Sequence, residues 1–217
     1  SVTLSLKPAG VAPGDVTDQQ LEIIADLADR FSFGEIRSTH NQNVVLADVA
    51  KYDLFELWQQ AKAAGLATPN IGTINDMICC PGGDYCSLAN AKSIPVAEAI
   101  QRKFDDLDYV YDLGNLELNI SGCMNACGHH HIGHIGILGV DKKGEEWYQI
   151  QLGGSANKAA ALGKVLGPSL SRDAVTDSVE KLLDVYVENR IEGEAFLGTY
   201  QRIGIEKFKQ RVYGTAS

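Results

Sequence analysis

Apolar and polar residues in the first third of the chain follow two different periods. Residues 2–6 alternate between apolar and polar side chains until Pro8 interrupts them, which predicts a strand followed by a linker. Residues 21–31 keep helical spacing behind a capping box formed by Thr17 and Gln20. We therefore expect this region to open with a strand and an amphipathic helix.

Two short apolar runs and a second helix complete this region. The runs at residues 36 and 44–49 predict two strands around a turn at residues 39–43. Asp53 is expected to cap a helix that ends at Gly65. The order strand, helix, strand, strand, helix predicts a small α+β unit that occupies the chain up to residue 68.

The rest of the chain predicts a larger α/β region with a mixed sheet, and Thr68-Pro69-Asn70 is the expected boundary. Ser93 is expected to cap a helix, and a strand at residues 116–120 runs directly into two cysteines. The other expected elements are a hairpin of residues 135–140 and 147–152, a long helix over residues 175–187 and short helical turns after Gly193.

Composition and charge exclude several classes of protein. The chain has 217 residues, enough for one large or two small domains, and its net charge of −9 disfavours nonspecific nucleic-acid binding. It has no apolar run long enough to span a bilayer and no signal for export or lipidation, so we expect a cytoplasmic protein without a membrane partner. It opens on Ser1 rather than Met, which is typical of a processed form or an excised piece.

Four of the five cysteines form two closely spaced pairs beside glycines. Cys80 and Cys86 form a C-x5-C motif, and Cys123 and Cys127 form a C-x3-C motif. Four thiolates in two tight clusters, in a reducing compartment, are the ligands that an iron–sulfur cluster needs. A helix that started at the second pair would place both sulfurs on one face and stabilise their thiolates.

Disulfides, core packing and zinc binding account less well for these cysteines. Disulfides are disfavoured in the cytoplasm, and unligated core cysteines would not form two glycine-rich pairs. Structural zinc sites usually show C-x2–4-C spacing in both halves, which the gap between Cys80 and Cys86 exceeds. The repeated C-x2-C pattern of simple ferredoxins is absent. Cys79 adjoins the first motif, and we interpret it as a buried bystander.

The segments around both motifs resemble a known family. Residues 78–89 and 121–128 are similar to the cluster signatures of the sirohaem/[4Fe–4S] sulfite and nitrite reductases, and residues 39–43 are similar to the T-x-x-Q-N turn of their ferredoxin-like half-domain. The resemblance covers almost the whole chain and looks closest to the C-terminal half of the assimilatory sulfite reductase haemoprotein (beta) subunit. It implies a ferredoxin-like half-domain over residues 1–68 and a sirohaem/[4Fe–4S]-binding domain over residues 69–217.

The resemblance also implies cofactors, partners and a reaction. Cys80, Cys86 and Cys123 would bind the cluster alone, while Cys127 would bridge it to the sirohaem iron. The family usually joins two such halves in one polypeptide, so the N-terminal half would be a partner. A flavoprotein subunit or a ferredoxin would donate the six electrons that convert sulfite to sulfide.

The charge distribution agrees with a missing half. From Phe104 to Asp141 the chain contains no Lys or Arg, although it contains several acidic residues. Sirohaem carries eight carboxylates and sulfite is an anion, so binding both in acidic surroundings is electrostatically unfavourable. We therefore expect the substrate-binding Arg and Lys residues on another chain or on a segment that this chain lacks.

Other polar residues near the motifs have two interpretations each. The resemblance makes Arg37, Asn41, Gln42 and Asn43 neighbours of the sirohaem carboxylates. Arg37 is equally well interpreted as a solvated charge at the end of a strand, and Asn41 and Asn43 as residues that stabilise the turn.

Histidines gather behind the second motif, at His129, His130, His131 and His134. They are either a source of positive charge or protons beside the haem, or a polar loop that shields the cluster, with one ring bonded to the backbone. A zinc site that combines Cys123, Cys127 and two of these rings is the competing metal hypothesis.

The sequence thus favours an α+β iron–sulfur protein that forms part of a sulfite reductase. Assimilatory nitrite reductase is the alternative within the same class, because the same cofactors serve both substrates. A noncatalytic, metal-stabilised interaction module is the alternative from another class. A small sirohaem protein that acts alone would have to supply its own haem cage, for example by oligomerising.

Overall fold

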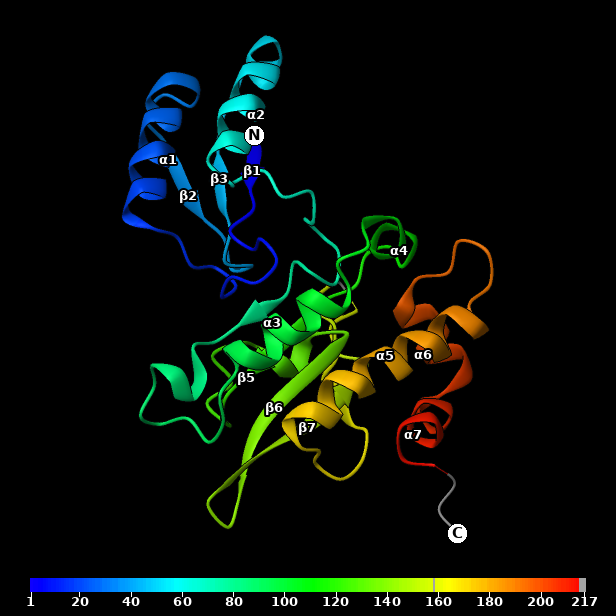
Figure 1. Cartoon of the computed structure of the whole chain (residues 1–217). Helices are drawn as coiled ribbons and strands as arrows, with labels where there is room; N and C mark the ends of the chain where they lie inside the picture. Colours follow the sequence, from blue (N-terminus) through cyan, green and yellow to red (C-terminus); the bar gives the residue numbers. More distant parts are fainter. Residues whose placement is uncertain (158, 215–217) are drawn as a thin grey trace.

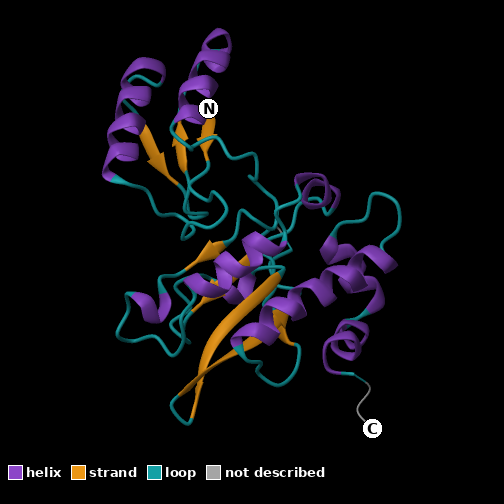
Figure 2. Ribbon diagram, viewed as in Figure 1, coloured by secondary structure: helices purple, strands orange, loops and turns teal. Residues whose placement is uncertain are grey.

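The computed structural model describes residues 1–157 and 159–214 of the chain. Figure 1 shows a small body that contains the N-terminus and a larger body that contains the remaining elements. Each body is built around its own sheet, as the ribbon coloured by secondary structure in Figure 2 makes clear. The α+β class and the mixed sheet predicted from the sequence are confirmed.

The small body is a three-stranded antiparallel sheet with two helices. Its strand order is β1-β3-β2, and Leu46 of β3 lies opposite both Val2 of β1 and Ile36 of β2. The second and third strands close around the turn at residues 39–43, as predicted. The elements are β1 (Val2–Leu4), α1 (Asp18–Phe31), β2 (Ile36–Ser38), β3 (Val44–Leu46) and α2 (Leu54–Ala63).

Both helices of this body start where the sequence patterns predict, but only α1 has a side-chain cap. Thr17 and Gln20 form both hydrogen bonds of the predicted capping box at the start of α1. Asp53 occupies the predicted N-cap position of α2, but its side chain makes no capping bond, and a 3-10 turn (Lys51–Asp53) leads into the helix. The two helices pack on the sheet through a separate core that includes Leu27 and Leu57.

The large body is a five-stranded sheet in the order β4-β5-β6-β7-β8. The first three strands are parallel, and the last two join them in antiparallel fashion. The predicted hairpin is present as β6 and β7, which pair along eight residues each. The strands are β4 (Ile78–Cys79), β5 (Leu118–Ser121), β6 (Ile135–Lys142), β7 (Glu145–Leu152) and β8 (Lys164–Val165).

Helices cover this sheet and complete the main core. In Figure 1, α3 and α5 lie together over one face, and α6 and α7 follow at the C-terminal end. Ser93 occupies the predicted N-cap position of α3, but its hydroxyl makes no capping bond. The helices are α3 (Ile94–Lys103), α4 (Leu107–Asp112), α5 (Arg172–Asn189), α6 (Phe196–Ile203) and α7 (Ile205–Tyr213).

A buried ion pair lies at the junction of the two bodies. The ammonium of Lys7, after β1, lies 2.7 Å from the carboxylate of Asp76, before β4, and both side chains are almost fully buried. Burial lowers the pKa of Lys7, and Asp76 opposes this effect. Asn70, in the connecting segment, accepts a hydrogen bond from Ser5 and donates one to the Lys7 carbonyl. The junction is therefore a specific polar contact.

None of the helices in the described ranges is long and apolar enough to cross a bilayer.

Candidate metal centre

The two cysteine motifs begin at the ends of neighbouring parallel strands. Cys80 directly follows β4, and Cys123 follows β5 by two residues. β4 and β5 pair in parallel through Cys79 and Ile120, so both strands deliver their motifs to the same edge of the sheet. The topology therefore brings together two motifs that lie far apart in the sequence.

The two motif loops are packed tightly against each other. Asn90 and Ala91, behind the first motif, both donate backbone hydrogen bonds to the Gly122 carbonyl, at 2.9 and 3.0 Å. A β-carbon at Gly122 would lie 2.7 Å from the Ala91 oxygen and 2.8 Å from the Gly82 α-carbon. A β-carbon at Gly82 would lie 2.5 Å from the Ser93 nitrogen. Gly82 and Gly122 therefore lack room for a side chain, because the backbones of the two motif loops pass each other closely here.

Within each pair, the first cysteine is buried and the second is more accessible. Cys80 and Cys123 are both 8% exposed. Cys86 is half-buried, and Cys127 is exposed. The Cys80 sulfur accepts a hydrogen bond of 3.0 Å from the Gly122 N–H, and the Ser93 hydroxyl lies 3.5 Å from it. The backbone of the second loop therefore contacts the first cysteine directly.

The second motif does not start a helix, so the condition under which both of its sulfurs would share one helical face is not met. Residues 122–128 form turns instead, and Ala126 has a left-handed φ of 57°, which interrupts helical geometry. The thiolates of Cys123 and Cys127 therefore gain nothing from a helix N-terminus. The turns are fixed locally, because the Gly128 N–H donates to the Ser121 hydroxyl at 3.1 Å and Asn119 donates to the His129 carbonyl at 3.0 Å.

The donor set suits a cluster better than a single ion. All five cysteines are free thiols. Among the described residues, no three His, Cys, Asp or Glu side chains lie close enough together to hold one metal ion. Four cysteine thiolates are the usual ligands of a [4Fe–4S] cluster, and the gap between Cys80 and Cys86 exceeds the spacing of structural zinc sites.

Cys79 occupies the position expected of a bystander. It is 3% exposed, and its thiol donates to the Cys80 carbonyl at 3.3 Å. Burial raises the pKa of the Cys79 thiol strongly, so that it stays protonated at neutral pH.

The turn at residues 39–43 reaches toward the first motif. The Gln42 side chain bonds to the backbone of Cys79, and Asn43 is buried between the Leu6 N–H and Asp76. Arg37 lies on β2, where its exposed guanidinium pairs with Glu35 at 2.6 Å. Figure 1 places this turn at the lower end of the small body, where it faces the large one.

A cavity of about 350 Å³ lies between this turn and the large sheet. His40 and Asn41 line it from the turn, Asn119 lines it from β5, and His129 lines it from the segment after the second motif. Asp76 and Glu117 add carboxylates, and no Lys or Arg is among its lining residues. This volume is near the lower end of the range of about 300–1,000 Å³ for small-molecule pockets. The cavity is therefore large enough for a small molecule or for one part of a larger group.

Two of the clustered histidines are buried and neutral. Burial lowers the pKa values of His130 and His134 to about 4. His134 accepts a hydrogen bond of 3.2 Å from the Glu117 N–H through Nδ1. These two rings therefore do not supply positive charge at neutral pH. His129, at the cavity wall, and His131 are more accessible.

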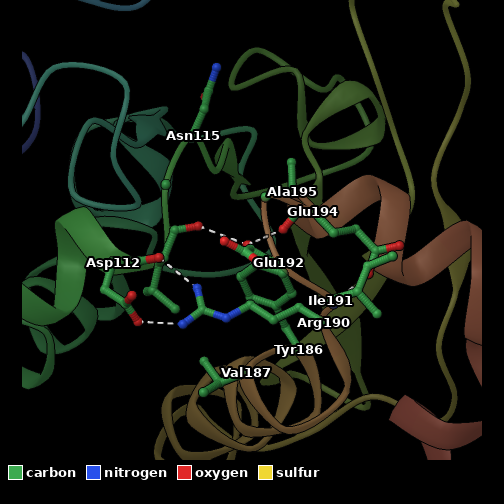
Figure 3. A pocket seen from close by; sticks show the side chains of 12 residues that line it. Asp112, Asn115, Tyr186, Val187, Arg190, Ile191, Glu192, Glu194 and Ala195 are labelled. Carbon is green, nitrogen blue, oxygen red and sulfur yellow. Dashed lines mark hydrogen bonds and ion pairs between the residues drawn. The ribbon is translucent and has the colours of Figure 1, made fainter.

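A second cavity, of about 590 Å³, lies between α4 and the end of α5. Figure 3 shows that Arg190, the one residue lining this cavity that carries a guanidinium, points at Asp112. The guanidinium bonds to the backbone carbonyl and to the carboxylate of Asp112. The Tyr186 hydroxyl donates to the Leu113 and Glu194 carbonyls. These polar groups satisfy one another and fasten α4 to α5, so they leave no free cation for an anionic cofactor.

Sequence reasoning missed several residues that shape the site. It did not find the Lys7–Asp76 pair, the contact of Gln42 with Cys79, or the crossing of the loops at Gly122. The first two join residues that are distant in sequence, so no local pattern signals them. The glycine of S-G-C was the one available signal, because glycine beside a ligand often marks a close approach of backbone.

Two family models together match most of the chain. The model described as "Nitrite and sulphite reductase 4Fe-4S domain" matches residues 72–216. The model described as "Nitrite/Sulfite reductase ferredoxin-like half domain" matches residues 4–64.

Individual relatives are similar over most of the chain but differ in length. "Sulfite reductase [ferredoxin] 2" of Mycolicibacterium paratuberculosis is 30% identical over 203 residues, which are 88% of this chain and 36% of that protein. The solved structure of Mycobacterium tuberculosis NirA has a TM-score of 0.77 and 26% identity, over 95% of this chain and 39% of that one. The chain thus spans little more than a third of the length of such relatives.

One relative has a comparable length. The "Sulfite reductase, assimilatory-type" of Nitratidesulfovibrio vulgaris is 25% identical over 211 residues, which are 95% of this chain and 89% of that protein.

Proposed function

Since this chain belongs to the nitrite and sulphite reductase family, we propose that it is the cluster- and sirohaem-ligating part of a cytoplasmic sulfite reductase. In this proposal residues 1–68 are a ferredoxin-like half-domain and residues 69–217 are the cofactor-binding domain. The main support is the arrangement of the C-x5-C and C-x3-C loops, which leave adjacent parallel strands and lock together at Gly122.

The family's cofactors are a [4Fe–4S] cluster and a sirohaem, as the motifs predicted. We assign the cluster to Cys80, Cys86, Cys123 and Cys127, with Cys127 as the ligand shared with the haem iron. Together the cofactors would pass to sulfite the six electrons that the external donor supplies for its reduction to sulfide. The exposure of Cys127 supports its assignment, because a shared thiolate must face a second group beyond the cluster.

The residues of this chain would hold and orient these groups. The Gly122 N–H donates a hydrogen bond to the Cys80 sulfur, and such hydrogen bonds tune the potential of clusters. The cavity between His40, Asn41, Asn119 and His129 would accept one edge of the sirohaem. Arg37, Asn41, Gln42 and Asn43 were expected at the haem carboxylates, and only Asn41 of these lines the cavity.

Binding of the anionic substrate would depend on cations from elsewhere. The cavity presents Asp76 and Glu117, while Lys7 is already paired with Asp76. Both sirohaem and sulfite would meet an unfavourable potential here. We therefore propose that an N-terminal half, as a separate chain or segment, supplies the Arg and Lys residues. An electron donor, a flavoprotein subunit or a ferredoxin, would be a further partner.

The relative of comparable length favours a second candidate. A protein named as an assimilatory-type sulfite reductase is only slightly longer than this chain, which supports a small reductase that acts without a second half. In that case two copies of the chain, or the exposed histidines His129 and His131, would have to replace the missing cationic wall.

One assay separates these candidates. The chain is loaded anaerobically with iron, sulfide and sirohaem, and it is assayed with a chemical one-electron donor against sulfite and against nitrite. We expect the cluster to bind to the chain alone, and sirohaem binding and sulfite turnover to stay low until a family N-terminal half is added. Normal sulfite turnover by the chain alone would support the small reductase. A clear preference for nitrite would assign the alternative substrate, and a chain that binds one zinc and no iron would be a noncatalytic module.

A further inference from the structure

We propose that Gln42 is a positioning residue: its side-chain amide holds the first cysteine loop so that Cys80 is placed for cluster binding. This inference rests on the proposed function, because it takes Cys80 as a cluster ligand. It assigns Gln42 a role different from contact with the sirohaem carboxylates.

The Gln42 amide makes two hydrogen bonds to a single residue of the large body. Its Nε2 donates to the Cys79 carbonyl at 2.8 Å, and its Oε1 accepts from the Cys79 N–H at 2.8 Å. The Gln42 amide and the Cys79 backbone each contribute one donor and one acceptor. The two bonds together fix the orientation of Cys79 and its distance from the Gln42 amide. The side chain thus spans the junction and ends one residue before the first cluster ligand.

The geometry of the sheet explains why this contact matters. β4 is the edge strand, with β5 on one side only. The Cys80 N–H bonds to the Ile120 carbonyl of β5 at 3.1 Å, so the polar groups of Cys79 face away from β5. Cys79 is buried, and unpaired backbone groups there would be costly. A further strand on this side of β4 would hydrogen-bond to the backbone of Cys79. The Gln42 amide makes these bonds instead.

The turn that presents Gln42 is rigid. Gln42 has a left-handed φ of 55°, and hydrogen bonds close the turn from the Gln42 N–H to the Thr39 carbonyl and from the Thr39 N–H to the Asn43 carbonyl. A β-carbon at Gly14 would lie 2.9 Å from the Gln42 β-carbon, so the N-terminal linker packs closely on this residue. The strained residue and its tight packing agree with a fixed direction of the side chain.

The buried ion pair at the junction fixes the same turn from behind. The Lys7 ammonium bonds to the Asn41 carbonyl as well as to Asp76, and the Asn43 amide donates to Asp76 at 2.8 Å. Asn43 is thus bonded directly to Asp76, which precedes β4, and Asn41 is linked to it through Lys7. The small body therefore holds the start of the first cysteine loop at two places.

The position of Gln42 disfavours the alternative role at the haem. Both ends of its amide are used by Cys79, and Gln42 lines a different cavity, of about 430 Å³, with Cys79, Pro81 and Tyr85. It is not among the residues that line the cavity with His40 and Asn41. The hydrogen bond from Gly122 to the Cys80 sulfur depends on the placement of the strand end that Gln42 fixes.

The first test is hydrogen exchange of the cluster-loaded chain, read at single residues by mass spectrometry. In Gln42→Ala the Cys79 amide should exchange about tenfold faster or more, because it loses its acceptor. The Cys80 amide, which bonds to Ile120, should keep its wild-type rate. In Gln59→Ala, a change at an exposed glutamine of α2, both amides should behave as in the wild type. Unchanged exchange at Cys79 in Gln42→Ala would overturn the proposal.

The second test measures the cluster itself. Gln42→Ala should release iron to a chelator about tenfold faster or more than the wild type, and its midpoint potential should shift, because second-sphere contacts orient ligands and tune metal centres. Gln42→Glu keeps an acceptor for the Cys79 N–H and loses the donor, so its release rate should be intermediate. Equal release rates and equal potentials in all variants would overturn the proposal.

The design separates failure of this inference from failure of the proposed function. If the wild-type chain holds a [4Fe–4S] cluster and Gln42→Ala holds it equally well, only the positioning role fails. If the wild type holds no cluster, the proposed function fails, while hydrogen exchange at Cys79, measured then on the cluster-free chains, still reports on the Gln42 hydrogen bonds. If Gln42→Ala folds, as judged by circular dichroism, but takes up no cluster while Gln59→Ala does, the positioning role is supported in its strongest form.

Discussion

The two cysteine loops leave the same edge of one sheet but are supported in different ways. The second loop follows β5, an internal strand paired on both sides, and its turns are closed by the side chains of Ser121 and Asn119 of that strand. The first loop follows β4, an edge strand of two residues, and it depends on Gln42 from the small body. The sheet by itself fixes one half of the site, and the small body fixes the other.

This difference gives the small body a structural role in the site. A two-residue edge strand has few hydrogen bonds of its own, so its end would otherwise be among the least stable parts of the fold. The Lys7–Asp76 pair and the Gln42 amide compensate for this at the side that β5 does not cover. Loss of the Gln42 bonds or of the Lys7–Asp76 pair should therefore disturb the position of Cys80 more than that of Cys123.

The largest expected effect distinguishes adjacent cysteines at the start of the first loop. Cys80→Ser should abolish cluster binding, because it removes a ligand, and Cys79→Ser should retain it, because the buried Cys79 thiol stays protonated. The measurement is iron and acid-labile sulfide per chain after anaerobic reconstitution. Full iron content in Cys80→Ser, or its loss in Cys79→Ser alone, would show that the ligands are misassigned.

Loss of the junction ion pair should have the next largest effect. Lys7→Met leaves Asp76 buried without its partner, and breaking a buried pair in this way costs about 3–5 kcal/mol of stability. Urea unfolding monitored by circular dichroism provides the free energy. Lys51→Met, at an exposed lysine, is the matched control and should stay near the wild type. A loss below about 1 kcal/mol for Lys7→Met would contradict the importance of the junction.

A smaller effect is expected where the two loops cross. Gly122→Ala introduces a β-carbon 2.7 Å from the Ala91 carbonyl oxygen, so it should push the loops apart and destabilise the fold by about 1–3 kcal/mol. Gly83→Ala is the control within the first loop, because the nearest atom there is the flexible Lys92 side chain at 3.3 Å. Equal stabilities of the two variants in urea would show that the crossing tolerates a side chain.

The smallest effect concerns pH and the histidines behind the second loop. Burial lowers the pKa of His134 from 6.5 to about 4 in the folded chain, so between these values only the unfolded chain binds the proton. Stability is therefore lost as the pH falls from about 6.5 toward 4. His134→Gln cannot titrate and should show a smaller loss of unfolding free energy between about pH 7 and about pH 5. His40→Gln, at an exposed histidine, should keep the wild-type slope; a wild-type slope in His134→Gln would contradict this account.

Local patterns in the sequence were sufficient for much of the fold. The capping box at Thr17, the hairpin of β6 and β7 and the amphipathic α5 all depend on contacts between near neighbours, and all are present as predicted. The strands β4 and β8 have two residues each and the helix α4 has six, which is too short for a period to be recognised. Their existence is decided by tertiary contacts.

The site was predictable in its ligands and less so in its geometry. The spacing of Cys80, Cys86, Cys123 and Cys127 was enough to propose a cluster. The second motif forms turns rather than a helix, because Ala126 adopts a left-handed conformation that no spacing rule reveals. The T-x-x-Q-N turn drew attention to Gln42, but its bond to Cys79 joins residues 37 positions apart and depends on the packing of the two bodies.

Iron and acid-labile sulfide in the anaerobically purified wild-type chain, recorded with its optical spectrum, test the central claim most directly. The account predicts about four iron and four sulfide per chain and the broad blue-edge absorption of a [4Fe–4S] cluster. A folded chain that contains one zinc and no iron, or that fails to take up iron and sulfide during reconstitution, would contradict it.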